Sequence, residues 1–121
     1  MMKINIVSAI FSLLVIGFTI SCANGQGKPN DIKTQLTKNP GKVIDVRTLD
    51  EWNEGHYSKA IHADWYNGDF QKLAETLDKN ENIYLYCRSG GRSGSATDYL
   101  KKRGFKNVYN LGGYSNFKGI D

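Results

Sequence analysis

The sequence predicts an α/β fold, a three-layer sandwich in which a mostly parallel central sheet is flanked by helices. Short apolar runs of strand length alternate with amphipathic segments of helix length along most of the chain. A glycine-rich loop follows the most apolar of the predicted strands, and in parallel sheets the functional loops lie at the carboxyl ends of strands. With 121 residues, 40% of them hydrophobic and 23% charged, the chain fits one small globular domain with an appendage.

The individual elements follow from local composition. The run Val43-Ile44-Asp45-Val46 is almost continuously apolar, as is typical of strands buried on both faces of a parallel sheet. Pro40 and Gly41 mark a turn before it. We expect helices at residues 31–36, 49–54, 70–77 and 95–102, and strands at residues 43–46, 60–61, 83–86 and 108–111.

The appendage is N-terminal, and residues 1–21 are predicted to be a signal peptide of the lipoprotein type. An apolar stretch from 4 to 20 follows Lys3 and precedes small and polar residues. It is shorter and more diluted than the roughly 20 apolar residues of a membrane span, which favours a cleaved signal over a retained anchor. We expect an exported protein, periplasmic or attached to a bacterial envelope membrane through a lipid at Cys22.

Two routes of processing are open at this site. The segment Thr19-Ile20-Ser21-Cys22 resembles a lipoprotein box, although Thr19 stands where leucine is usual. Ordinary cleavage at residues 21–23 would instead remove Cys22 with the leader. Residues 22–30 are polar and rich in helix breakers, as in a tether, and residues 31–121 are expected to form the folded domain.

Charge and histidine spacing exclude several kinds of partner. Loss of the leader leaves 15 basic and 12 acidic residues, a net charge of +3, which is too small to indicate nucleic-acid binding. His56 and His62 do not have the spacing of a metal-ligand pair, so no metal site is predicted. The sequence also gives no sign of a cofactor.

Cys87 opens the most informative motif, a loop expected between a strand and a helix. Glycine permits the positive φ that turns successive amide N–H groups inward, next to a helix N-terminus. Such a ring favours a thiolate, so we expect Cys87 to be a nucleophile that attacks an anionic substrate. The alternative is that Cys87 is a small apolar residue that ends a buried strand. The substrate is expected to be bound by the residues that follow: Arg88, Ser89, Gly90, Gly91, Arg92 and Ser93.

Three motifs, in order, resemble those of a single-domain rhodanese. The first is the segment at 45–56, with its Asp-Val-Arg start and Gly-His end; the second is the loop at 87–93; the third is Leu-Gly-Gly-Tyr at 111–114. The chain departs from the family at 57–60, where Tyr-Ser-Lys-Ala replaces the usual Ile-Pro-Gly-Ala. We expect Asp45 and Arg47 to support the backbone and to fix Glu51 by an ion pair, whereas the roles of His56 and Arg88 stay open.

The resemblance implies a sulfurtransferase. Cys87 would accept the outer sulfur of thiosulfate or a related donor as a persulfide, and would pass it to cyanide or a thiol. Phosphatase relatives place five residues between the cysteine and the arginine of this loop, whereas four lie between Cys87 and Arg92, which favours sulfur transfer. A second hypothesis is a non-catalytic module that binds a partner or senses oxidants through the same thiol.

Overall fold

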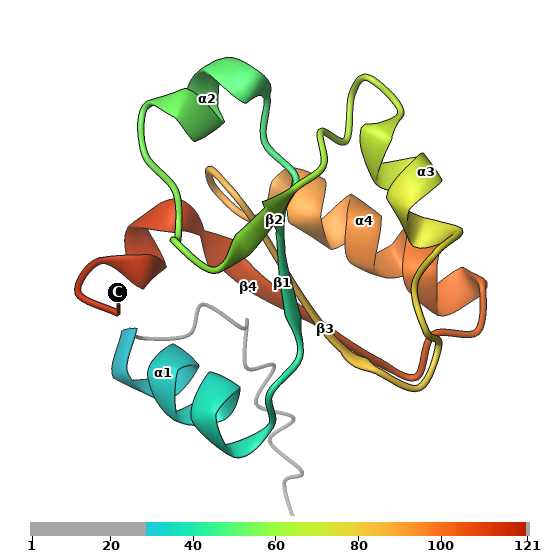
Figure 1. Ribbon diagram of the computed structural model, residues 1–121, viewed down its shortest axis with the longest axis horizontal. Helices are drawn as coiled ribbons and strands as arrows, with labels where there is room; N and C mark the ends of the chain where they lie inside the picture. The colour runs from blue at the N-terminus through green and yellow to red at the C-terminus, as the bar shows by residue number, and fades with distance from the viewer. Residues whose placement is uncertain (1–28, 121) are drawn as a thin grey trace, which may run out of the picture.

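The computed structural model describes residues 29–120 as helices and strands in alternation (Figure 1). The first half of the chain forms α1 (Pro29–Lys38), β1 (Lys42–Asp45), α2 (Leu49–Asn53), β2 (Ala60–His62) and α3 (Asp69–Ala74). The second half forms β3 (Asn82–Cys87), α4 (Gly91–Lys102), β4 (Asn107–Gly113) and the 3-10 helix η1 (Tyr114–Phe117).

The four strands form one parallel sheet in the order β2-β1-β3-β4. Residue Val43 of β1 lies opposite Ala60 of β2 on one side and opposite Tyr84 of β3 on the other. Because all four strands run in the same direction, their carboxyl ends meet at one edge of the sheet. Asp45, His62, Cys87 and Gly113 end the strands at this edge.

Two apolar cores, one on each face of the sheet, produce the predicted three layers. Successive residues of a strand point to opposite faces. Ile83, Leu85 and Cys87 therefore pack toward α3 and α4 with Phe70 and Leu100. Side chains of the other face pack with α1 and η1: Ile32, Val43, Tyr57, Tyr84, Tyr86, Leu111 and Phe117. The predicted α/β sandwich is confirmed (Figure 1).

The largest departure from the predicted elements is the start of α4. The sequence predicts a helix from residue 95, whereas α4 begins at Gly91, directly after the loop. Gly90 is the N-cap residue and has a φ of +97°, a conformation that glycine adopts without steric cost. Arg92 and Ser93 consequently lie in the first turn of a helix and not in a free loop.

Other boundaries differ by a few residues. Helix α1 begins at Pro29 and α3 ends at Ala74, while β4 continues to Gly113. The predicted signal peptide, Cys22 and the tether up to residue 28 lie outside the described residues. Within residues 29–120, no helix has the length and apolar character needed to cross a membrane.

Candidate active site

Cys87 lies at the carboxyl end of β3, underneath the loop that leads into α4. Its side chain is buried, with 1% of the residue exposed. The Gly90 amide donates a hydrogen bond to Sγ at 3.0 Å, and the Ser93 hydroxyl lies 3.4 Å from the same sulfur. The sulfur is therefore buried, and the backbone of its own loop covers it.

Two opposing effects act on the pKa of Cys87. Burial is the largest, and alone it would raise the pKa of the thiol. Hydrogen bonds from the Ser93 hydroxyl and from the backbone amides of Ser93, Ser89 and Gly90 stabilise the thiolate and together outweigh burial. The pKa of Cys87 is lowered as a result, because the loop supplies polar N–H groups to the buried sulfur.

The glycine pair at the end of β4 lets this strand run directly beside the loop. A Cβ atom on Gly113 would lie 2.4 Å from the carbonyl oxygen of Arg88, and Gly113 is the register partner of Cys87. The Cβ position of Gly90 lies 3.3 Å from the Cα atom of Gly112. Gly113 of the third sequence motif thus has a steric purpose, because a side chain there would collide with the backbone of Arg88.

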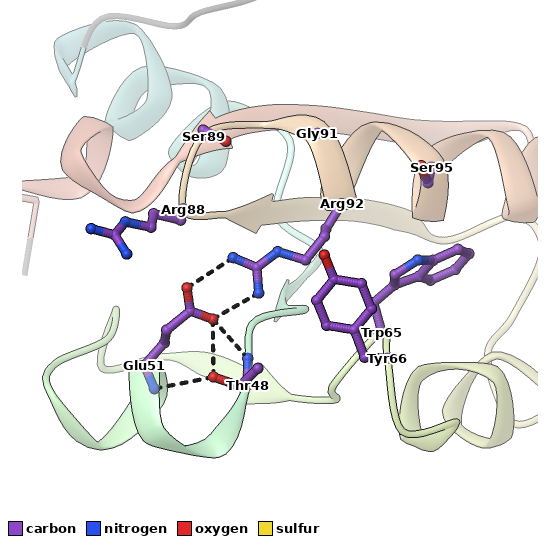
Figure 2. Close-up of a pocket in the computed structure, with 9 residues that line it drawn as sticks. All are labelled: Thr48, Glu51, Trp65, Tyr66, Arg88, Ser89, Gly91, Arg92 and Ser95. Atoms are coloured by element: carbon purple, nitrogen blue, oxygen red, sulfur yellow. Dashed lines mark hydrogen bonds and ion pairs between the residues drawn. The ribbon is translucent and has the colours of Figure 1, made fainter.

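Glu51 and Arg92 form an ion pair that joins α2 to the first turn of α4 (Figure 2). The pair is bidentate, with Nη1 to Oε2 at 2.7 Å and Nη2 to Oε1 at 2.8 Å. Glu51 is also the N3 residue of a capping box with Thr48. The Arg92 guanidinium is the main cause that lowers the pKa of Glu51 to about 2.

The expectation that Arg47 would be the partner of Glu51 is wrong. Arg47 instead pairs with Asp45 at 2.7 Å, and both side chains are buried. The same nitrogen of Arg47, Nη2, also donates to the carbonyl oxygen of Gly55 at 2.7 Å, and the guanidinium lies 4.5 Å from the ring centre of Tyr114. The Asp45–Arg47 pair therefore fixes the turn after α2 against η1, away from the thiol.

An open pocket of about 660 Å³ lies outside the loop, and we call it the loop-mouth pocket (Figure 2). Tyr66, which is 71% exposed, and Trp65 form an aromatic wall on one side. The Arg88 side chain extends away from the Glu51–Arg92 pair and has no hydrogen-bond or ion-pair partner within residues 29–120. The complete lining is Thr48, Glu51, Trp65, Tyr66, Arg88, Ser89, Gly91, Arg92 and Ser95.

The predicted loop residues therefore divide into two groups. Arg88, Ser89, Gly91 and Arg92 line the loop-mouth pocket. Gly90 and Ser93 lie closer to the sulfur, and Ser93 is fully buried.

His56 belongs to a different part of the surface. Its ring stacks on Trp52 with the centroids 3.4 Å apart, and its Nδ1 lies 2.9 Å from the Trp52 carbonyl oxygen. The ring of His62 also stacks on Trp52, with the centroids 5.0 Å apart. Neither histidine lines the loop-mouth pocket, and residues 29–120 contain no group of three potential metal-ligating side chains.

Asn110 of β4 is a site residue that the sequence analysis did not identify. Its Oδ1 lies 2.7 Å from the Ser93 hydroxyl, and its Nδ2 donates to the Gly90 carbonyl oxygen at 3.1 Å. The only signal in the sequence is a polar residue that stands directly before the third motif at the end of an apolar strand. That signal does not indicate which loop the side chain contacts.

Comparison with known proteins agrees with this geometry. Residues 28–120 match the model of the rhodanese-like domain. The chain belongs to this family. Its fold also resembles the rhodanese-like domain of the Alr3790 protein from Anabaena, with a TM-score of 0.66 and 25% identity over 79% of this chain and 74% of that one.

Several relatives have names that refer to sulfur transfer. The Bacillus subtilis protein YtwF, named as a candidate sulfurtransferase, is 40% identical over 77 residues, which are 64% of this chain and 73% of that protein. The thiosulfate sulfurtransferase GlpE of Coxiella burnetii is 35% identical over 77 residues, 63% of this chain and 70% of GlpE. These likenesses support a sulfurtransferase-type enzyme.

Other relatives are much longer than the matched segment. The chain spans 36% of the Bacillus subtilis protein YrkF, which is named as a sulfur carrier protein. It also spans 34% of a tRNA uridine(34) hydroxylase from Chlamydia felis, at 33% identity. The same domain thus occurs in proteins whose names describe different activities.

Proposed function

We propose that the protein transfers sulfane sulfur from thiosulfate, or a related anionic donor, to cyanide or a thiol through a persulfide on Cys87. The observation that carries the proposal is the ring of N–H groups around Sγ. The amides of Ser89, Gly90 and Ser93 lower the pKa of a buried thiol, and a thiolate is the form that attacks sulfur.

The reaction has two balanced steps. The Cys87 thiolate attacks the outer sulfur of thiosulfate, a sulfur–sulfur bond forms at Sγ, and the bond within the donor breaks with release of sulfite. The negative charge moves from Sγ to the outer sulfur of the persulfide. Cyanide then attacks that outer sulfur, thiocyanate leaves, and the electron pair of the broken bond returns to Sγ as the thiolate.

Arg88 is the side chain best placed to attract the donor. Both terminal nitrogens of Arg92 are bound to Glu51, so the opposite charges of these two side chains largely offset each other. Arg88 is exposed, lines the loop-mouth pocket and has no ion-pair partner in the described part of the chain. A guanidinium presents a planar fork that suits oxyanions, and here it would bind the sulfonate end of thiosulfate.

The burial of Cys87 supports a second candidate, a module that senses oxidants or binds a partner without turnover. Cys87 is 1% exposed and does not line the loop-mouth pocket, so a small donor in that pocket does not contact Sγ. This candidate predicts that the thiol does not take up sulfur from small donors.

One experiment with two readouts separates the two candidates. The full chain is incubated with thiosulfate and its intact mass is recorded, followed by a colorimetric assay of thiocyanate after cyanide is added. We expect a gain of one sulfur atom that is absent in Cys87→Ser, and catalytic formation of thiocyanate. If neither signal appears in a correctly folded protein, the sulfurtransferase proposal fails.

We also propose that the protein is exported and held at a bacterial envelope membrane by a lipid on Cys22. The support is the sequence of residues 1–22 alone. Mass spectrometry of the mature protein from bacterial cells tests this proposal: a diacylglyceryl group on an N-terminal Cys22 is expected. An N-terminus after residue 22, or an intact leader, would contradict it.

A further inference from the structure

The Ser93 hydroxyl lies between two groups that compete for its single proton. Its oxygen is 2.7 Å from Oδ1 of Asn110 and 3.4 Å from Sγ of Cys87. A hydroxyl has one hydrogen to donate and lone pairs with which to accept. Ser93 can therefore donate to Asn110 or to Cys87, but not fully to both.

The orientation of the Asn110 amide does not depend on Ser93. The Gly112 amide, which can only donate, lies 3.0 Å from Oδ1. The Gly90 carbonyl oxygen, which can only accept, lies 3.1 Å from Nδ2. These two backbone groups fix which end of the side chain is oxygen, so the atom that faces Ser93 is an acceptor.

The preferred direction of the Ser93 proton then depends on the state of the sulfur. When Cys87 is a neutral thiol, the shorter contact holds the proton toward Asn110, and a Ser93 lone pair faces the thiol proton. When Cys87 is a thiolate, its negative charge attracts the proton, because hydrogen bonds to ionised groups are stronger than neutral ones. Formation of the thiolate then breaks the Ser93–Asn110 hydrogen bond.

We infer that Asn110 is a positioning residue that acts through Ser93: it holds the Ser93 proton away from Cys87 and releases it when the nucleophile ionises. In the mechanism under "Proposed function", on which this role rests, persulfide formation moves the charge to the outer sulfur. Sγ becomes neutral at that point, and the Ser93 proton returns to Asn110. Asn110 thus gives the loop two hydrogen-bond states that alternate with the steps of sulfur transfer.

Charged groups at this edge of the sheet also act on Cys87, since the Arg92 guanidinium attracts its thiolate, but none of these groups is changed in the variants below. Arg88 and Arg92 of the loop and α4, and Glu51 of α2, surround the loop mouth. Asp64 follows β2 at this edge, and the Asp45–Arg47 pair lies at the end of β1. Asn110 itself is neutral, so its effect on Cys87 is expected to pass through the Ser93 hydrogen bond.

The test is a double-mutant cycle on the ionisation of Cys87 in the full chain. Asn110→Leu and Asn110→Asp have nearly the size of asparagine, and both lose the bond to Gly90, but only Asp keeps an acceptor that faces Ser93. Each is made with Ser93 present and in a Ser93→Ala background. The readout is the pH midpoint of the NMR shift of the Cys87 Cβ carbon, with Cys22→Ser used to assign the signal.

With Ser93 present, we expect Asn110→Leu to lower the midpoint, so that the ratio of thiolate to thiol at a fixed pH rises about fivefold, the scale of one neutral hydrogen bond. Asn110→Asp is expected not to lower it. In the Ser93→Ala background, Asn110→Leu is expected to leave the midpoint unchanged. An equal shift in both backgrounds would overturn the inference, because Asn110 would then act by general loosening of the loop.

A second readout separates this inference from the sulfurtransferase proposal. The Cys87 titration needs no donor, so the expected cycle remains measurable in a protein that forms no thiocyanate. A missing thiocyanate signal with an intact cycle would reject the proposed function and keep the Asn110–Ser93 coupling. Thiocyanate formation with no coupling between Ser93 and Asn110 would support the proposed function and reject this inference.

Discussion

The ion pair between Glu51 and Arg92 predicts a loss of stability in Glu51→Gln that depends on pH. Glutamine is nearly the same size and is also accepted at the N3 position of a capping box, so the substitution removes the charge and keeps the cap of α2. The expected loss of stability therefore comes from the bidentate ion pair that joins α2 to α4.

The magnitude follows from the pKa of Glu51, which is lowered from 4.5 to about 2 in the folded protein. A shift of this size corresponds to about 3 kcal/mol if it arises wholly on folding. The two side chains are 15% and 20% exposed at an open pocket, so solvent screens part of this energy. We expect Glu51→Gln to lower the free energy of unfolding by about 1–2 kcal/mol at neutral pH.

The pH dependence has a definite sign. Above pH 4.5 the carboxylate is ionised in both the folded and the unfolded chain, and the stabilisation is complete. As the pH falls, the unfolded chain takes up the proton first, and the contribution is lost by about pH 2. The difference in unfolding free energy between wild type and Glu51→Gln should therefore become smaller as the pH falls from 4.5 to about 2.

Urea unfolding followed by tryptophan fluorescence, repeated over a pH series, measures the difference. Glu81→Gln is the matched control, because the Lys42–Glu81 pair has the same 2.7 Å contact but is 41% and 28% exposed. The control should change the free energy of unfolding by less than about 0.5 kcal/mol. If Glu51→Gln matched its control at neutral pH, or if its deficit stayed constant down to pH 3, the reasoning would be refuted.

Three further substitutions probe other parts of the site. Arg88→Ala should raise the KM for thiosulfate about tenfold without a change in unfolding midpoint, since it removes one exposed charge-assisted contact; an unaltered KM counts against donor binding by Arg88. Asp45→Ala should lower the free energy of unfolding by about 3–5 kcal/mol in urea titrations, because it leaves a buried guanidinium without its partner. Gly113→Ala should cost about 1–3 kcal/mol and reduce thiocyanate formation, because its new methyl group would meet the Arg88 backbone. Gly91→Ala, whose Cβ position is open, is its control for stability, and an equal loss of unfolding free energy in the two variants would contradict the steric argument.

The fold could be predicted from the sequence because its signals are local. Each strand is a short apolar run, and alternation of strands with helices permits few arrangements other than a parallel sheet with helices on both faces. The start of α4 was missed because glycine disfavours helix in isolation, whereas Gly90 here caps the helix and Gly91 begins it.

The partners within the site could not be predicted, because they lie far apart in the sequence. Glu51 and Arg92 are separated by 41 positions, and only the placement of α2 over the first turn of α4 brings them together. Arg47, the nearer candidate in sequence, is taken by Asp45 two positions before it. The contact between Ser93 and Asn110 likewise depends on the register of β3 with β4.

Three kinds of group divide the work at the loop. Backbone amides and the Ser93 hydroxyl stabilise the Cys87 thiolate, while Arg92 is bound to Glu51 and holds the loop against α2. Because Glu51 offsets the charge of Arg92, hydrogen bonds are the main interactions that lower the pKa of the thiol. In the proposed mechanism Arg88 attracts the anion, since it is exposed at the loop mouth, and its replacement is expected not to disturb the sulfur. Reactivity and donor affinity are thus expected to be separable in this domain, since they rest on different atoms of one short loop.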